Sequence, residues 1–211
     1  MRSKIEKFIK SFKNVLIVFI FLITLVFLYK VINLQFVKYN EPSFLKDKKI
    51  LTVYYSHGNN TEHIAKALHS IVGGNIQKIN VVDKYPKNIF KFNSLVRKQI
   101  EENYIPEIDK IDFTNYDIIF VGSPIWLGNV SLPVRSFFKN NNFDNKTVIS
   151  FLSYSGGAKR EDVKQSIEKL IKENSDNVKV LTPMLTFKGG IVLVNKQIEN
   201  WLNSLGEKEE K

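Results

Sequence analysis

The sequence predicts an α/β domain that follows a single apolar helix near the N-terminus. Two observations predict the domain: short β-rich apolar runs alternate with helical patterns, and glycine, serine and asparagine gather directly after three of those runs. A third observation, an uninterrupted apolar stretch of membrane-spanning length, predicts the helix. Hydrophobic residues make up 44% of the 211 residues, which is typical of a chain with a folded core and argues against disorder.

The apolar stretch reads VLIVFIFLITLVFLY over residues 15–29, with Thr24 as its polar interruption. Extended to residue 34, it holds 20 residues and one charge, Lys30, near its end. At ~1.5 Å per residue, a helix of this length crosses a hydrocarbon core of ~30 Å. It lacks the polar stripe of a core helix, and no small-residue cleavage pattern follows it, as the alternative, a signal peptide, would require. We therefore predict an uncleaved lipid-spanning anchor over residues 15–34.

Basic residues are distributed unevenly around this anchor. Five precede it, whereas Lys30 and Lys38 alone fall in the fifteen positions that follow the apolar run 15–29. The positive-inside rule then favours a single-pass protein of the cell membrane with an extracytoplasmic domain, and Lys46, Lys48 and Lys49 reduce that asymmetry. The expected segments are a basic flank at 1–14, the anchor at 15–34, a linker at 35–48, the domain at 49–206 and a charged tail at 207–211.

The residue types exclude several kinds of site. The chain has no cysteine, so disulfides, thiolate nucleophiles, iron–sulfur clusters and cysteine-ligated zinc are excluded, and redox chemistry requires a bound cofactor. His63 and His69 fall on different faces of a predicted helix, so we expect no metal site. No spacing indicates paired catalytic carboxylates, and no residue is predicted to be catalytic. The net charge is +10, but without an arginine cluster among exposed aromatic residues we expect no nucleic-acid partner.

Five predicted strands alternate with helices along the domain. This alternation predicts a parallel sheet covered on both faces, and such sheets bind ligands beyond the carboxyl ends of their strands, at a topological switch point. The loops after the first, third and fourth strands are therefore the informative ones. Strands are expected at Ile50–Tyr55, Ile76–Val82, Asp117–Val121, Thr147–Leu152 and Val178–Leu181. Helices are expected from a Thr61 cap to Gly73, at about 87–102, from Pro133 to about Asn140, at Arg160–Glu173 and at Asn195–Leu205, where Gly206 ends the last one.

The first loop joins a strand directly to a helix N-terminus. It reads Ser56-His57-Gly58-Asn59-Asn60-Thr61, so hydroxyls and amides accompany unpaired backbone N–H groups and the positive end of the helix dipole. These features favour an anion. The loop has no lysine of the Walker type, so a terminal monophosphate is expected rather than a nucleoside triphosphate with magnesium. The alternative is an ordinary capped turn.

The other two loops offer flat and small side chains. The second, Gly122 to Asn129, places Pro124, Ile125, Trp126, Leu127 and Gly128 after a strand, and the indole offers a face for a flat heteroaromatic ring. The alternative is that Trp126 merely packs against a neighbouring helix. The third loop supplies small side chains, exposed backbone amides and a second aromatic ring; it reads Ser153-Tyr154-Ser155-Gly156-Gly157.

These three loops together resemble the flavodoxin family. ILTVYYSHGNNTEHIAKAL is similar to the flavodoxin first strand, phosphate loop and first helix, YDIIFVGSPIWLGNVSLPVRSFF to the segment around the third strand, and FLSYSGGA to the third FMN loop. The resemblance covers about residues 49–205 and is closest to short-chain flavodoxins that have a proline–tryptophan loop. It implies a flavodoxin-like three-layer sandwich with a five-stranded parallel sheet in the order 2-1-3-4-5, and FMN as the cofactor.

The resemblance also implies roles for individual residues. Ser56, Asn60 and Thr61 would bind the FMN phosphate with backbone amides from His57 to Asn59. Trp126 would lie against the isoalloxazine ring, in a loop shaped by Pro124, Ile125 and Gly128. The loop from Ser153 to Gly157 would line the other side of the ring or its pyrimidine edge, with Tyr154 as a second stacking partner.

The chain departs from the family pattern at two places. The family's phosphate loop reads Ser/Thr-x-Ser/Thr-Gly-Asn-Thr, so this chain lacks one hydroxyl and has Asn59 at the usual glycine; asparagine tolerates a left-handed conformation better than most residues. A lost hydroxyl contact weakens phosphate binding by about 1–3 kcal/mol. Leu127 stands where the family often has a second tryptophan.

Three functions follow from these observations. The first is a membrane-tethered FMN electron carrier that serves a redox partner protein or a quinone-like acceptor. The second is an FMN-dependent NAD(P)H:quinone-type reductase, for which the stretch 83–115 would roof a substrate pocket. The third is a flavin-free, degenerate flavodoxin domain that acts as an interaction module, which the altered phosphate loop motivates.

Overall fold

The structure is a computed structural model that describes residues 2–36, 41–155, 160–187 and 193–209. The chain divides into two compact units, Met1–Tyr39 and Asn40–Lys211. Each unit is described by itself.

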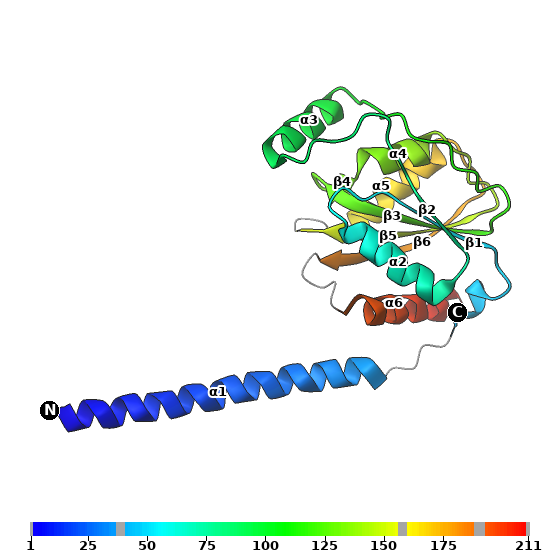
Figure 1. Ribbon diagram of the computed structural model, residues 1–211. Coiled ribbons are helices and arrows are strands. Elements are labelled where there is room, and N and C mark those ends of the chain that lie inside the picture. Colours follow the sequence, from blue (N-terminus) through cyan, green and yellow to red (C-terminus); the bar gives the residue numbers. More distant parts are fainter. Residues whose placement is uncertain (1, 37–40, 156–159, 188–192, 210–211) are drawn as a thin grey trace. The chain divides into compact units, whose positions relative to one another are not determined.

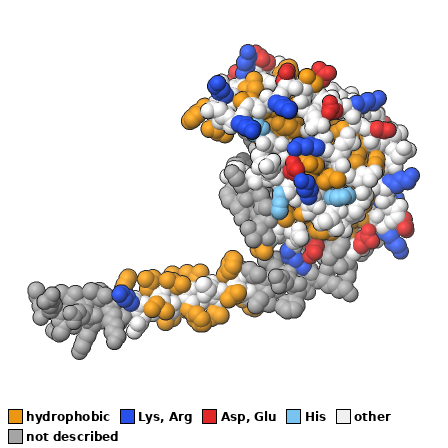
Figure 2. Space-filling view, in the orientation of Figure 1, with side chains coloured by type: hydrophobic (Ala, Val, Ile, Leu, Met, Phe, Trp, Pro, Cys, Tyr) orange, Lys and Arg blue, Asp and Glu red, His pale blue; other side chains and the backbone are white. Residues whose placement is uncertain are grey.

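The first unit is one long helix, α1, Arg2–Phe36 (Figure 1). Its most apolar window, Phe12–Tyr29, has a mean hydropathy of 2.4 over 18 residues. The apolar side chains of that window are 44–68% exposed, and Figure 2 shows them along the helix in orange. In the described part of the chain, this is the one helix long and apolar enough to cross a membrane, and a signal sequence near an N-terminus would have the same properties.

The second unit is built around a parallel sheet in the strand order β2-β1-β3-β5-β6. With the strands numbered along the chain, this is the expected 2-1-3-4-5 order, because the additional β4 pairs only with β3, and does so antiparallel. The predicted α/β fold class is therefore confirmed. The strands are β1 Ile50–Tyr54, β2 Asn75–Lys78, β3 Ile118–Trp126, β4 Asn129–Val130, β5 Thr147–Tyr154 and β6 Lys179–Phe187.

Helices cover both faces of this sheet. Helices α2 and α6 contact one another over one face, and α4 and α5 contact one another over the other (Figure 1). Helix α3 belongs to the excursion between β2 and β3, and its Phe92 and Val96 join the hydrophobic core. The helices are α2 Asn60–Val72, α3 Ile89–Glu101, α4 Leu132–Lys139, α5 Arg160–Lys172 and α6 Val194–Glu209, and a short 3-10 helix, η1 Ser43–Leu45, precedes β1.

Several predicted boundaries are wrong, each for a physical reason. Helix α2 begins at Asn60 with Asn59 as its N-cap residue, so Thr61 lies inside the helix. Helix α6 continues through Gly206 into the predicted charged tail. Gly206 packs closely there, since a Cβ atom at that position would lie 3.0 Å from the Cβ of Pro42.

Of the predicted linker, residues 35–48, positions 37–40 lie outside the described residues. Helix α1 extends to Phe36, and Leu45 of η1 is only 2% exposed in the second unit. The second strand is shorter than predicted. Ile79 N–H still donates to the Tyr54 carbonyl of β1 at 2.7 Å, and the chain then forms an isolated antiparallel bridge between Val81 and Ile108. That bridge begins the excursion that carries α3.

Candidate functional site

The first loop connects the end of β1 to the start of α2. Asn59 has φ 63°, in the left-handed region, which asparagine tolerates better than most residues. Its carbonyl accepts the first helical hydrogen bond from His63 N–H at 2.9 Å, and its side chain caps no helix N–H group. Within the part of the chain that the structure describes, the Asn59 side chain therefore leaves the first N–H groups of α2 available to an anion.

Hydroxyl groups of the first loop differ in their surroundings. Thr61 is 1% exposed, and its Oγ1 lies 2.8 Å from Ser153 Oγ, so this hydroxyl ties α2 to β5. Ser56 Oγ, by contrast, is buried and has no hydrogen-bond partner in the described part of the chain. An unsatisfied buried hydroxyl costs about 1–3 kcal/mol, which makes it a candidate ligand contact.

The second predicted loop is largely strand, a correction to its assignment. Strand β3 continues to Trp126 and turns back into β4 over Leu127 and Gly128, whose φ angles are 47° and 86°. Two positive φ angles make this a tight two-residue hairpin. Glycine and proline predicted a loop here. Strand β1 ends opposite Gly122, so β1 does not extend to Pro124 and does not require the backbone N–H that proline lacks.

Close packing explains the glycine that precedes this hairpin. A Cβ atom at Gly122 would lie 2.4 Å from the Phe151 ring and 2.9 Å from the Cβ of Tyr54. The absence of a side chain at position 122 therefore leaves the space that the Phe151 ring and the Tyr54 side chain occupy.

Trp126 lies in an aromatic cluster, which we define as Tyr55, His57, Tyr85, Phe92 and Trp126. The indole is 8% exposed, and its ring centroid lies 4.8 Å from that of Tyr85 and 4.9 Å from that of Phe92, both edge-on. His57 stacks on Phe92 at 4.7 Å with an interplanar angle of 13°. Burial raises the pKa of both tyrosines above the usual range. Trp126 thus packs against helix α3, as the alternative interpretation of this residue expected. Its indole also borders a pocket.

All three loops meet at this pocket, which we call the three-loop pocket. Its volume is about 230 Å³, somewhat below the ~300–1,000 Å³ usual for small-molecule sites. It lies at the carboxyl ends of β1, β3 and β5, as predicted. Its lining comprises His57, Gly58, Asn60, Ile89, Phe92, Pro124, Ile125, Trp126, Ser153, Tyr154 and Ser155.

The lining separates the predicted site residues into three groups. Nine of them line the pocket, whereas Ser56, Asn59, Thr61, Leu127 and Gly128 lie beside it without lining it. Gly156 and Gly157 lie outside the described residues. Ile89 and Phe92 were not predicted; both come from α3, inside the 83–115 stretch that was expected to roof a pocket.

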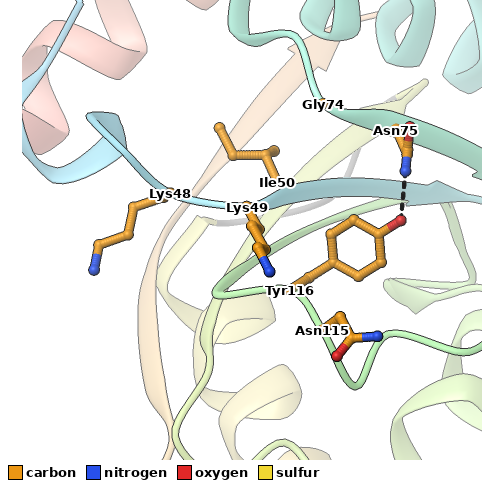
Figure 3. A pocket seen from close by; sticks show the side chains of 7 residues that line it. All are labelled: Lys48, Lys49, Ile50, Gly74, Asn75, Asn115 and Tyr116. Atoms are coloured by element: carbon orange, nitrogen blue, oxygen red, sulfur yellow. Dashed lines mark hydrogen bonds between the residues drawn. The ribbon is translucent and has the colours of Figure 1, made fainter.

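Another pocket lies at the opposite edge of the sheet (Figure 3). It has about 370 Å³ and is lined by Lys49, Gly74 and Tyr116 among others, and Tyr116 Oη accepts a hydrogen bond from Asn75 Nδ2. This edge carries the amino ends of the strands, whereas ligands of parallel sheets bind at the carboxyl ends. We therefore take the three-loop pocket as the site, although it is smaller.

The family model described as flavodoxin matches residues 49–205. The chain belongs to the flavodoxin family. The match covers the sheet, its helices and all three loops, and it leaves out α1 and the C-terminal end of α6. None of the curated proteins matches this flavodoxin-family chain.

Solved structures give the same picture. A flavoprotein in complex with FMN from Lactobacillus acidophilus NCFM is 26% identical with a TM-score of 0.55, covering 65% of this chain and 93% of its own. A candidate flavoprotein from Bacteroides eggerthii DSM 20697 is 25% identical with a TM-score of 0.57, covering 75% and 98%. Another from Bacteroides uniformis ATCC 8492, 21% identical with a TM-score of 0.59 and coverage of 75% and 99%, shows the fold.

Proposed function

We propose that this flavodoxin-family protein binds FMN non-covalently at the three-loop pocket and carries electrons with it. The observation that carries the proposal is the convergence of three loops on one pocket at the carboxyl edge of the sheet, beside the N-terminus of α2. The 26% identical flavoprotein with bound FMN supports the choice of cofactor.

The residues present fit such a group. The unsatisfied Ser56 Oγ and the N–H groups at the start of α2 suit a phosphate, while Pro124, Ile125 and Trp126 offer an apolar wall to a flat ring. Ser153, Tyr154 and Ser155 line the opposite part of the pocket. No carboxylate is among the described residues that line it.

In this proposal the cofactor supplies one- and two-electron chemistry, and the protein binds and orients it. Asn60, which lines the pocket, holds the phosphate with the backbone amides of His57 to Asn59, while Ser56 and Thr61 lie beside them. Trp126 limits the access of water to the ring. Because the aromatic cluster already fixes the indole, the wall is preorganised. Electron transfer requires no catalytic acid or base, in agreement with the predicted lack of one.

The test is the colour of the full-length protein purified in a non-ionic detergent. It is expected to show a flavin spectrum and to release FMN on denaturation, and apoprotein is expected to regain the spectrum when FMN is added. Protein that stays colourless after incubation with FMN would instead support the flavin-free interaction module.

One observation favours the reductase as a second candidate. Helix α3 contributes Ile89 and Phe92 to the pocket, as a roof over a substrate would. Anaerobic addition of NADPH or NADH to the FMN-loaded protein distinguishes the two functions. Rapid bleaching without an added reductase would identify an enzyme, and unchanged absorbance a carrier that depends on a partner protein or a quinone-like acceptor.

We further propose that α1 is an uncleaved single-pass anchor in the cell membrane and that the domain is extracytoplasmic. The apolar window Phe12–Tyr29 and the basic residues before it support this assignment. The protein is expected to remain in membranes washed with alkaline carbonate, and protease added to intact cells is expected to digest the domain. Protection of the domain from protease in intact cells would show that the domain is cytoplasmic. Release of the protein by carbonate would show that α1 is not a membrane anchor.

A further inference from the structure

Exposed large apolar side chains are distributed unevenly over the second unit. In its described part all of them come from the excursion between β2 and β3 or from the hairpin of β3 and β4, and they are Val82, Ile89, Phe90, Tyr104 and Leu127. The most exposed is Phe90, at 81%. Apolar side chains that gather on one part of a surface, and not singly all over it, indicate an interaction site.

Three of these residues form one surface, which we call the apolar rim: Ile89 and Phe90 at the start of α3, and Leu127 in the turn of the hairpin. The two elements adjoin, because the ring of Phe92 in α3 lies 4.9 Å from that of Trp126, the residue before Leu127. Ile89 and Trp126 also line the three-loop pocket, so the apolar rim borders it. Figure 2 shows orange side chains at this end of α3, with blue side chains around them.

The backbone of Leu127 gives a second sign of an external contact. Among the described non-glycine residues with positive φ, all the others are asparagine or aspartate, which tolerate this region, whereas Leu127 has φ 47° with its side chain 51% exposed. A two-residue hairpin turn prefers asparagine or aspartate at this position. Such strained residues are found mainly at functional sites. The fold alone therefore does not explain a leucine here.

The charge around the apolar rim indicates the kind of partner. Lys87 and Lys91 flank Ile89 and Phe90 in the sequence, and neither forms an ion pair with the described part of the chain. Apolar side chains beside lysines are typical of contacts with a lipid surface, where the apolar groups enter the interface and the ammonium groups attract anionic headgroups. Headgroups form an extended plane, so these lysines need not converge on one atom. Residues 84–100 include no acidic residue, and their basic residues are Lys84, Lys87, Lys91, Arg97 and Lys98.

We propose that the apolar rim and its flanking lysines bind an anionic lipid surface. Lipid is favoured over an acidic protein because residues 30–39, which join the apolar window of α1 to the second unit, span at most about 36 Å. An anchor in the bilayer would keep the domain within reach of the headgroups, and this step rests on the proposed anchor. Since Ile89 belongs to both the rim and the pocket lining, the contact brings the pocket to the bilayer, where a quinone-like acceptor dissolves; this consequence rests on the proposed function.

The experiment uses the lack of cysteine in this chain, because a single introduced cysteine then carries a nitroxide spin label at one known position. Full-length Phe90→Cys is labelled and reconstituted into nanodiscs of phosphatidylglycerol, which is anionic, or of phosphatidylcholine, which has no net charge. The matched control is Asn115→Cys, an exposed residue at the amino edge of the sheet (Figure 3). Electron paramagnetic resonance measures how often each label meets oxygen, which concentrates in lipid, and a water-soluble nickel chelate.

In phosphatidylglycerol the label at position 90 is expected to lose contact with nickel and to gain contact with oxygen, and in phosphatidylcholine it is expected to stay accessible to nickel. The label at position 115 is expected to be accessible in both. Adding Lys87→Glu/Lys91→Glu is expected to abolish the protection at position 90. Lys110→Glu/Lys169→Glu changes two exposed lysines outside the 84–100 segment by the same charge and is expected to retain the protection.

The strained turn provides a separate measurement. Leu127→Asn is expected to raise the urea concentration at the midpoint of unfolding and to reduce the protection of the label at position 90. A lower midpoint with unchanged protection would show that Leu127 serves the fold and not the lipid contact.

Other results would overturn the proposal. They are a label at position 90 that stays accessible to nickel in phosphatidylglycerol, protection that survives the Lys87→Glu/Lys91→Glu change, and protection in detergent without lipid, which would assign the surface to another protein molecule. The measurement needs no flavin, so failure of FMN binding does not affect it. If α1 is not an anchor, the full-length protein should float with phosphatidylglycerol vesicles only at low salt and only with Lys87 and Lys91 present, which would refute the anchor and support the lipid contact.

Discussion

The two edges of the sheet differ in how completely their polar groups are satisfied. At the amino edge, Asp144 accepts a hydrogen bond from Asn177 N–H at 2.8 Å, and Lys146 Nζ donates to the carbonyls of Thr114 and Tyr116 at 2.6 Å each. At the carboxyl edge, Thr61 Oγ1 lies 2.8 Å from Ser153 Oγ, but Ser56 Oγ is buried without a partner in the described part of the chain. The polar groups named at the amino edge thus stabilise the fold, whereas the Ser56 hydroxyl at the carboxyl edge contributes no hydrogen bond to it among the described residues.

The aromatic cluster is expected both to stabilise the fold and to contact the ligand. The substitution Trp126→Ala tests this expectation and has the largest predicted effect. Removing a buried indole is expected to lower the free energy of unfolding by about 3–5 kcal/mol and also to weaken FMN binding. Urea denaturation of the apoprotein and fluorescence titration with FMN measure the two effects.

Trp201→Ala is the matched control for that experiment. Trp201 is also 8% exposed, but it lies on α6, where its Nε1 donates to the Thr182 carbonyl. The Trp201→Ala substitution is expected to lower the free energy of unfolding by a similar amount without changing the affinity for FMN. Equal loss of FMN affinity in both variants would show that Trp126 acts only through the stability of the core.

Ser175→Ala sharpens the comparison at the amino edge. Ser175 is 2% exposed, and its Oγ accepts a hydrogen bond from the buried Phe143 N–H at 2.7 Å. The substitution leaves that N–H unsatisfied, so unfolding is expected to become about 1–3 kcal/mol easier while FMN affinity stays the same. A change in FMN affinity, measured by fluorescence titration, would contradict the separation of the two edges.

Ser56→Ala is the corresponding change at the carboxyl edge, and the opposite result is expected. The Ser56 hydroxyl makes no hydrogen bond in the described part of the chain, so its removal is expected to leave apoprotein stability unchanged or slightly higher. The affinity for FMN is expected to fall roughly ten- to a hundredfold. A destabilised apoprotein in chemical denaturation would show that the hydroxyl already has a structural partner.

Glu62→Gln has the smallest expected effect and tests electrostatics beside the first loop. Hydrogen bonds from Lys66 and Lys78 lower the pKa of Glu62 below 4.5. Because the folded pKa is the lower one, the stabilisation is present above about pH 4.5 and is lost as the pH falls through the folded pKa. The pair is exposed enough that we expect less than about 1 kcal/mol, which salt reduces further.

Unfolding of wild type and Glu62→Gln as a function of pH measures this contribution. The two curves are expected to differ at pH 7 and to converge in acid. A difference that persists in acid would mean that Glu62 contributes through packing and not through its charge.

Local patterns predicted the fold well where they were uninterrupted. The apolar runs of β1 and β5 and the helical spacing of α2 and α5 appear within a few residues of their expected positions. The predictions were wrong at glycine and proline residues, which occur at the ends of elements but also inside them. Pro124 and Gly122 predicted a loop but lie in β3, and Gly206 predicted a helix end but lies in α6, because strand register and helix packing decide those positions.

The sequence by itself determined the alternation of strands and helices, and with it the edge of the sheet at which the three loops meet. Those features depend on residues close together in the chain. Only the tertiary structure decided that α3 lies against Trp126, that Thr61 pairs with Ser153 and that Ser56 is left without a partner among the described residues. These contacts join segments up to 92 residues apart, so they depend on how the elements pack and not on any local pattern.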